Sequence, residues 1–206
     1  MPDPTLRFAI EVRDGGRGED RAACFTAHGR HVLVVADGAG GVGGGAVAAE
    51  CVVRAAEGLA HGAHGSAADA LRSVDAELSG LGCMSTGVIV EVRDGLISGA
   101  SCGDSVAWLI SAGGVEELTG HQLRKPLLGA GGSPVAFGNV QLRGALILAT
   151  DGLVNYATRG AIVEASAGGT IRASARTLAE LPRMQSGDYP DDVAVVLVRP
   201  RQVPAR

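Results

Sequence analysis

The sequence predicts an α+β fold, a central β-sandwich of two mainly antiparallel sheets flanked by helix pairs, which makes four layers in the order αββα. The segments follow one another as strands, two helices, strands, helices and one last strand. Helices that come in pairs, separate from the strands, are typical of layered α+β proteins. The 206 residues show no internal repeat. We therefore expect one domain over residues 1–200 and a frayed C-terminal tail over 201–206.

The first part of the chain supplies three strands and two helices. The Gly29-Arg30 pair separates two apolar runs and indicates a hairpin. Ser66 precedes a helical segment, where its side chain can cap the first turn. From these signals and the apolar periodicity we predict strands at 6–13, 21–28 and 31–37, and helices at 45–62 and 66–82.

The middle of the chain is rich in strands. Residues 84–118 contain four short extended runs, and Asp94-Gly95 is a strong hairpin turn between two of them. Residues 119–138 contain glycine and proline without periodicity, which predicts a surface loop. Residues 140–151 have the pattern of two paired strands.

The last part of the chain returns to helices before a final strand. Helical composition covers 153–157, 160–167 and 170–181, with Thr170 as the cap of the third segment. Residues 193–200 are almost continuously apolar and end at Pro200, which predicts a buried strand.

Composition excludes several classes of protein. The net charge of −4 and an aromatic content of 3% argue against nucleic-acid binding. No window approaches the ~20 apolar residues of a membrane span, and the charged N-terminal stretch does not have the pattern of a secretory signal. The four cysteines lack CxxC spacing, so we expect reduced thiols in a cytoplasmic protein.

Aspartates stand at the ends of apolar runs. Asp37, Asp151 and the pair Asp191-Asp192 follow or precede predicted strands, and Asp104 lies between two more. If these strands are neighbours, their ends bring the carboxylates together. Two such charges ~4 Å apart repel by about 4 kcal/mol at an effective dielectric constant of about 20. A carboxylate cluster therefore predicts a bound cation, and oxygen ligands suit Mg²⁺ or Mn²⁺.

Two glycine-containing motifs allow other interpretations. Residues 38–43 match GxGxxG, the dinucleotide fingerprint, but Asp37 would point at the pyrophosphate and no parallel strand ending in an acid follows. Residues 99–103 match GxSxG, the nucleophile elbow, but a strand and not a helix follows the serine. A metal loop fits the first motif better, with the Asp37 carboxylate and the Gly38 carbonyl as ligands.

The chain resembles the metal-dependent serine/threonine protein phosphatases of the PPM, or type 2C, family, in a small bacterial form. The blocks that carry the resemblance keep their order over nearly the whole chain: GED (18–20), VVADGAGG (34–41), MSTGVIV (84–90), SCGDSVAWLI (101–110), LATDGL (148–153) and DDVAVVLV (191–198). The resemblance implies a β-sandwich flanked by helix pairs, with a binuclear Mg²⁺ or Mn²⁺ centre at one end.

The resemblance also implies a role for each matching residue. Asp37 would bridge the two ions, with the Gly38 carbonyl on one of them and Asp151 and Asp191 on the other. Asp104 would help to hold a third, weaker ion. The residues in supporting positions would be Glu19 and Asp20, through metal-bound waters, and Asp192, beside the ligand Asp191.

The chain departs from the family pattern at the phosphate-binding arginine. That position is Gly15, so Arg13 or Arg17 would have to take its place. The histidine that some members carry after the metal-loop aspartate is Ala39, and the arginine common after the GDS block is Val106.

The resemblance implies hydrolysis of phosphoserine and phosphothreonine in proteins by a metal-activated water. The phosphoprotein substrate would be the product of a Ser/Thr kinase, and we expect a monomer. The alternative is a catalytically weak or inactive regulator of the same fold that binds phosphoproteins, for which the missing arginine argues. A nucleotide-binding oxidoreductase is the third possibility, and it predicts NAD(H) binding without a divalent cation.

Overall fold

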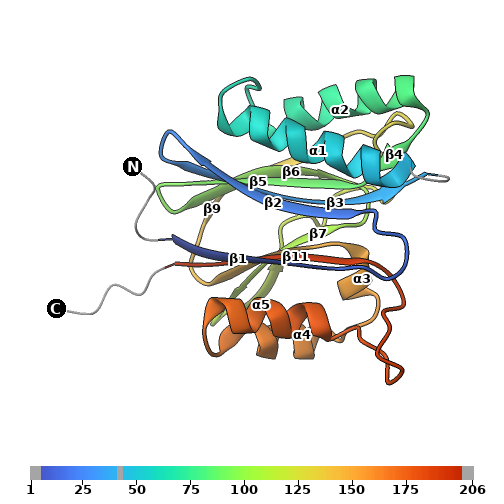
Figure 1. Ribbon diagram of the computed structural model, residues 1–206. Helices are drawn as coiled ribbons and strands as arrows, with labels where there is room; N and C mark the ends of the chain where they lie inside the picture. The colour runs from blue at the N-terminus through green and yellow to red at the C-terminus, as the bar shows by residue number, and fades with distance from the viewer. Residues whose placement is uncertain (1–5, 41–43, 201–206) are drawn as a thin grey trace.

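The structure is a computed structural model that describes residues 6–40 and 44–200. Two antiparallel sheets pack face to face, with helices on both outer faces (Figure 1). The elements in chain order are β1 (Leu6–Arg13), β2 (Asp20–Ala27), β3 (Arg30–Ala39), α1 (Gly44–Ala60), α2 (Ala67–Leu81), β4 (Met84–Ser85), β5 (Gly87–Arg93), β6 (Leu96–Cys102), β7 (Val106–Ser111), β8 (Gly114–Glu117), β9 (Val135–Gln141), β10 (Ala145–Ala149), α3 (Asp151–Val154), α4 (Arg159–Ala167), α5 (Ile171–Glu180) and β11 (Val193–Pro200).

One sheet has the strand order β1-β11-β10-β7-β8, and the other has the order β2-β3-β5-β6-β9 with the short β4 beside β3. Helices α1 and α2 cover the second sheet, and α4 and α5 cover the first (Figure 1). The α+β class and the four-layer αββα order predicted from the sequence are confirmed. Among the described residues, no helix is both long and apolar enough to cross a membrane.

Strand β3 contributes side chains to two layers of the hydrophobic core, one on each of its faces. Val32, Val34 and Ala36 pack against α1 and α2. Leu33 and Val35, which alternate with them, pack between the two sheets. Side chains alternate between the faces of a strand, so an unbroken apolar run is what a strand buried on both faces requires.

Strand β11 does the same in the other sheet. Val196 and Val198 face the space between the sheets. Val195 and Leu197 face α4 and α5. The residues 193–200 predicted as a buried strand are therefore central, and β11 pairs with β1 on one side and with β10 on the other.

The structure confirms one predicted hairpin turn and two predicted helix caps. Asp94 and Gly95 both have positive φ, 52° and 74°, as a type I′ hairpin requires. The Ser66 hydroxyl accepts a hydrogen bond from the Asp69 N–H, and Thr170 caps α5 in the same way.

The turn between β2 and β3 lies one residue earlier than predicted. His28 and Gly29 have φ values of 50° and 76°, so they are the two central residues, and Arg30 begins β3. Glycine therefore takes the second central position of the turn, where a positive φ is needed.

Two expectations about residues 119–151 were wrong. Strand β9 begins at Val135, so the predicted loop is shorter by its last residues. In addition, β9 and β10 do not pair with each other: β9 pairs with β6, and β10 pairs with β7 and β11 in the opposite sheet. The short link between them crosses the sandwich, and Leu142 packs between the sheets as the chain passes.

Candidate functional site

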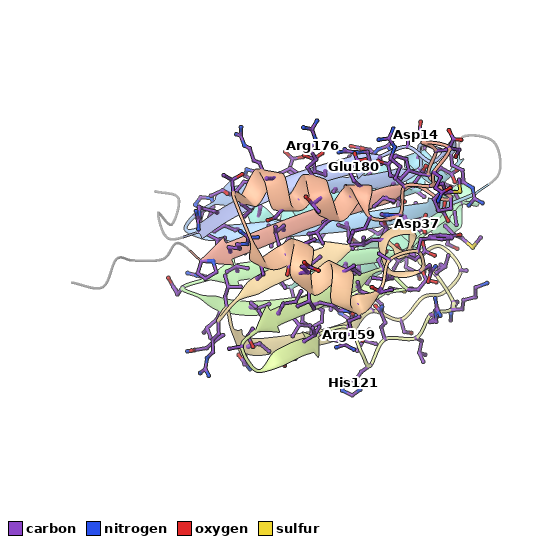
Figure 2. All side chains as sticks on the ribbon, turned by 90° about the horizontal axis from the view of Figure 1, so that it is seen from below. Asp14, Asp37, His121, Arg159, Arg176 and Glu180 are labelled. Carbon is purple, nitrogen blue, oxygen red and sulfur yellow. The ribbon has the colours of Figure 1, made fainter. Side chains whose placement is uncertain are left out.

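The predicted acidic residues come together at one end of the sandwich. Asp37 lies near the end of β3, and Asp20 lies directly opposite it at the start of β2. Asp104 is in the turn between β6 and β7, and Asp151 is the first residue of α3. The Asp191-Asp192 pair precedes β11. Figure 2 places Asp37 at the end of the sandwich where the connecting loops gather, beyond the ends of α4 and α5.

Three carboxylates form the centre of this cluster. Asp37, Asp104 and Asp151 each offer an oxygen, and these oxygens lie within 4.8 Å of one another. All three residues are half-buried. Three oxygen ligands from separate segments, without cysteine or histidine, match the preference of Mg²⁺ and Mn²⁺. The donor set therefore fits a hard divalent cation.

The carboxylates of the cluster repel one another. Burial, and then the charges of Asp151, Asp191 and Asp104, raise the pKa of Asp37 to about 7. Burial and the neighbouring Asp104 and Asp191 also raise the pKa of Asp151. Asp191 is thus close enough to act on both carboxylates, although it is not one of the three whose oxygens meet. A cation would relieve this repulsion.

Asp20 lies beneath the cluster and not on its surface. Only 3% of the residue is exposed. The Thr150 hydroxyl donates to Asp20 Oδ2 at 2.6 Å and accepts from the Ala194 N–H at 2.8 Å. Burial, and then the charge of Asp37, raise the pKa of Asp20 to about 9. Thr150 therefore ties β2 to β11 and β10 directly below the carboxylates.

Asp192 organises the loop between β1 and β2. Its Oδ1 accepts from the Gly15 N–H at 2.6 Å, and its Oδ2 accepts from the Glu19 N–H at 2.6 Å. Although burial opposes the charge of Asp192, these backbone donors outweigh it and hold the pKa of the carboxyl below its ordinary value. The side chain of Asp192 thus fixes the loop that carries Arg17 and Glu19.

Gly38 and Glu19 meet at the start of α1. A Cβ on Gly45 would lie 2.7 Å from the Gly38 carbonyl oxygen and would collide with the Glu19 carboxylate. Both oxygen groups therefore approach the first turn of α1, where only glycine leaves them room. Residues 41–43 of the glycine-rich motif lie outside the described part of the chain.

The two arginines expected to bind phosphate have different surroundings. The Arg13 guanidinium contacts Glu11 at 2.7 Å and Glu180 at 3.0 Å, so it is paired with carboxylates outside the cluster. Arg17 is 71% exposed and lies 4.0 Å from Asp191 Oδ1. Gly15 has no room for a side chain, because a Cβ there would collide with the backbone of Asp191.

Sequence reasoning missed two polar residues beside the cluster. Arg124 NH2 lies 3.4 Å from Asp104 Oδ2, and its side chain is 71% exposed. Asn155 Nδ2 donates to Asp151 Oδ2 at 2.9 Å. Both line a cavity of about 320 Å³ next to Asp104. Asn155 could have been found from its place one helical turn after Asp151, whereas Arg124 lies in a loop without periodicity.

The structure does not support either glycine-motif alternative. Strand β3 is antiparallel to both β2 and β5, whereas the dinucleotide fingerprint belongs to a parallel sheet. Ser101 is fully buried in β6, and the turn at Asp104 leads into β7 and not into a helix. Ser101 therefore lacks the exposed position that a nucleophile elbow provides.

The four-layer αββα sandwich is also the fold of bacterial serine/threonine phosphatases of known structure. The Mycobacterium tuberculosis phosphatase PstP/Ppp superposes with a TM-score of 0.81 at 22% identity, over 96% of this chain and 100% of that one. A structure of the PstP catalytic domain in complex with two manganese ions gives a TM-score of 0.81 at 22% identity, over 96% of this chain and 99% of that chain.

Staphylococcus aureus Stp1, a serine/threonine phosphatase, gives a TM-score of 0.80 at 20% identity, over 96% of both chains. No family model matches the sequence, and neither does any curated protein. The fold expected from the resemblance to type 2C phosphatases is therefore confirmed by structural similarity.

Proposed function

We propose that this protein is a metal-dependent phosphatase that hydrolyses phosphoserine and phosphothreonine in proteins. The observation that carries the proposal is the meeting of the Asp37, Asp104 and Asp151 carboxylates, with oxygens within 4.8 Å of one another. They lie at the end of a sandwich that superposes on bacterial serine/threonine phosphatases. One of those neighbours binds two manganese ions, which supports Mn²⁺ or Mg²⁺ here.

In this proposal the chain's own residues hold the cations and orient the substrate. Asp37 would bridge two ions, with the Gly38 carbonyl on one of them and with Asp151 and Asp191 on the other. Asp104 would serve a third, weaker site. When bound, the cations supply Lewis acidity that activates water and neutralises charge on the phosphoryl group.

The residues around the ligands have supporting roles. Glu19, whose carboxylate lies beside the first turn of α1, would reach the site through water. Asp20 and Thr150 support the strand ends from below, and Asp192 fixes the loop that carries Arg17. Asn155 orients Asp151 by donating to its carboxylate. Each of these contacts keeps a carboxylate or an arginine in place before substrate arrives.

Two exposed arginines are available for the phosphate. Arg17 lies near Asp191, and Arg124 lies near Asp104, so they approach the cluster from different sides. Arginine binds phosphate through two parallel hydrogen bonds. Arg13 is the weaker candidate, because its guanidinium is already paired with Glu11 and Glu180.

The second candidate function is a regulator that binds phosphoproteins without turning them over. Gly15 favours it, because the arginine of the family has no room at this position. In either case the partner would be a phosphoprotein produced by a Ser/Thr kinase. We further propose that the protein acts in the cytoplasm as a monomer.

Substitution of the cluster tests the proposed activity. Asp37→Asn and Asp151→Asn should each reduce Mn²⁺-dependent hydrolysis of a phosphothreonine peptide by at least about a hundredfold, because each removes a charge that holds a cation. Asp94→Asn is the matched control, since Asp94 is in an exposed turn of β5–β6 and should keep full activity. Wild-type rates in both cluster variants, with circular dichroism unchanged, would contradict the proposal.

A further inference from the structure

A group of arginines lies at the end of the sandwich away from the acidic cluster. Arg7 is near the start of β1 and Arg199 is near the end of β11, and the two are directly opposite each other in the antiparallel pair. Asp192 precedes β11, so Arg199 is about 23 Å further along the strand, at ~3.3 Å per residue. Arg143, just before β10, belongs to the same end of the sheet.

This arrangement places like charges together. Identical charges directly opposite each other on antiparallel strands destabilise the pair. No ion pair between described residues includes Arg7, Arg143 or Arg199. Burial, and then the charge of Arg7, lower the pKa of Arg199. No carboxylate in the described part of the chain therefore pairs with this group.

Arg199 is held in a fixed position. Its guanidinium donates to the carbonyl of Ser166 in the last turn of α4, to those of Gly168 and Gly169 just after it, and to the Ser174 hydroxyl at 2.7 Å. These bonds link β11 to the C-terminal end of α4 and the start of α5. Because its N–H groups already have these four acceptors, Arg199 contributes mainly a fixed positive charge, and the exposed Arg7 and Arg143 supply the guanidinium groups that can reach an anion.

The three arginines line one cavity of about 770 Å³. Ile110, Ala145 and Val163 form apolar parts of its wall. None of the described residues that line it is acidic. A volume of this size is typical of sites for small organic molecules, which combine an apolar wall with a few charged groups.

We propose that this cavity is a second site, which binds a phosphate-bearing organic anion. Arg7 and Arg143 would bind the phosphate oxygens beside the fixed charge of Arg199, and the apolar wall would contact the organic part of the ligand. The anion would also relieve the repulsion between Arg7 and Arg199. This site does not depend on the proposed activity, because it shares no residue with the acidic cluster.

Thermal unfolding of the full chain in EDTA tests the site with phenyl phosphate as the probe. Without cations the acidic cluster stays negative and repels anions. A rise in Tm therefore reports on binding at Arg7, Arg143 and Arg199. We expect phenyl phosphate to raise Tm by about 5 °C at a hundred times its Kd, while sodium chloride at equal ionic strength does not. A short phosphoserine peptide in the same titration distinguishes a free small molecule from a phosphorylated protein segment as the source.

Arg7→Glu provides the decisive variant. It places a carboxylate opposite Arg199, so it should raise Tm without any anion and abolish the response to phenyl phosphate. Arg143→Gln should weaken the response without raising Tm. Arg176→Glu on α5 is the control, because it makes the same change of charge at an exposed side chain (Figure 2), and Arg176 does not line the cavity. A response to phenyl phosphate no larger than that to chloride, or one that survives in Arg7→Glu, would overturn the site.

Discussion

Two carboxyl groups of the acidic cluster have pKa values in the neutral to alkaline range. Burial raises the pKa of Asp20 to about 9 and, with the neighbouring acids, that of Asp37 to about 7. An aspartate in an unfolded chain has a pKa of about 3.9. The folded protein therefore holds protons that the unfolded chain has lost between about pH 4 and these higher values.

This difference makes the stability of the metal-free protein depend on pH. The stabilising contribution is complete below about pH 4 and is lost as the pH rises through the folded pKa values of about 7 and 9. We expect the Tm in EDTA to fall from pH 5 to pH 9. Asp20→Asn should flatten this dependence, because it keeps an oxygen to accept from Thr150 but carries no charge. A Tm that rises over this range in the wild-type protein would disprove the protonation of the cluster.

The arginines near the cluster lead to a kinetic prediction. Arg17→Ala and Arg124→Ala should each raise KM for a phosphothreonine peptide by at least about tenfold, with a smaller effect on kcat, because a charged hydrogen bond to phosphate contributes roughly 1.5–3 kcal/mol. Arg93→Ala is a control at an exposed arginine at the end of β5. Steady-state kinetics at saturating Mn²⁺ make the comparison, and an unchanged KM in both variants would assign phosphate binding to another residue.

At the scale of single elements, the loop between β1 and β2 is fixed by contacts with the segment before β11. The Gly15 and Glu19 N–H groups bind the Asp192 carboxylate, and Gly15 packs against the Asp191 backbone. This packing leaves no room at position 15 for the arginine of the type 2C pattern. A side chain at Gly15 would displace a residue that is proposed to hold a cation.

An arginine at position 15 should therefore reduce both the stability and the activity of this protein. Gly15→Arg and Gly15→Ala should both lower stability, by about 1–3 kcal/mol for the overpacking, and reduce activity. Gly160→Ala is the matched control, since a Cβ there meets no atom within 4 Å. Urea unfolding and turnover measure the two effects. Gain of activity in Gly15→Arg would mean that the loop can shift to admit the arginine.

The elements that sequence predicted well are those whose signals are local. The β5–β6 turn, the caps at Ser66 and Thr170, and the apolar strand β11 each depend on a few adjacent residues. The pairing of β9 was mispredicted, because alternation identifies a strand but not its partner. The link between β9 and β10 is as short as a hairpin turn. The chain nevertheless crosses from one sheet to the other there, and Leu142 packs between the two sheets.

At the scale of the whole molecule, the fold assembles the site from distant segments. Asp37 and Asp151 are far apart in sequence, and the packing of two sheets brings the ends of β3 and β10 to the same edge. The position of each aspartate at a strand end predicted this meeting. The approach of Arg124 could not be predicted, because it depends on the path of an irregular loop over that edge.

The two ends of the sandwich have opposite charge. Acids gather where β11 begins, and Arg7 and Arg199 face each other where it ends. Repulsion within each group opposes folding, so each end should gain stability from a ligand of opposite sign. A cation at one end and an organic phosphate at the other would both stabilise the sandwich without sharing a residue.

The most direct test of the proposed phosphatase is hydrolysis of p-nitrophenyl phosphate by the purified chain with Mn²⁺, with Mg²⁺ and with EDTA. The account predicts turnover with at least one of the cations and none in EDTA, because the activating charge must be supplied to the Asp37, Asp104 and Asp151 cluster. No turnover, with Mn²⁺ still bound in calorimetry, would favour the phosphoprotein-binding regulator. Turnover that persists unchanged in EDTA would contradict the metal-dependent mechanism.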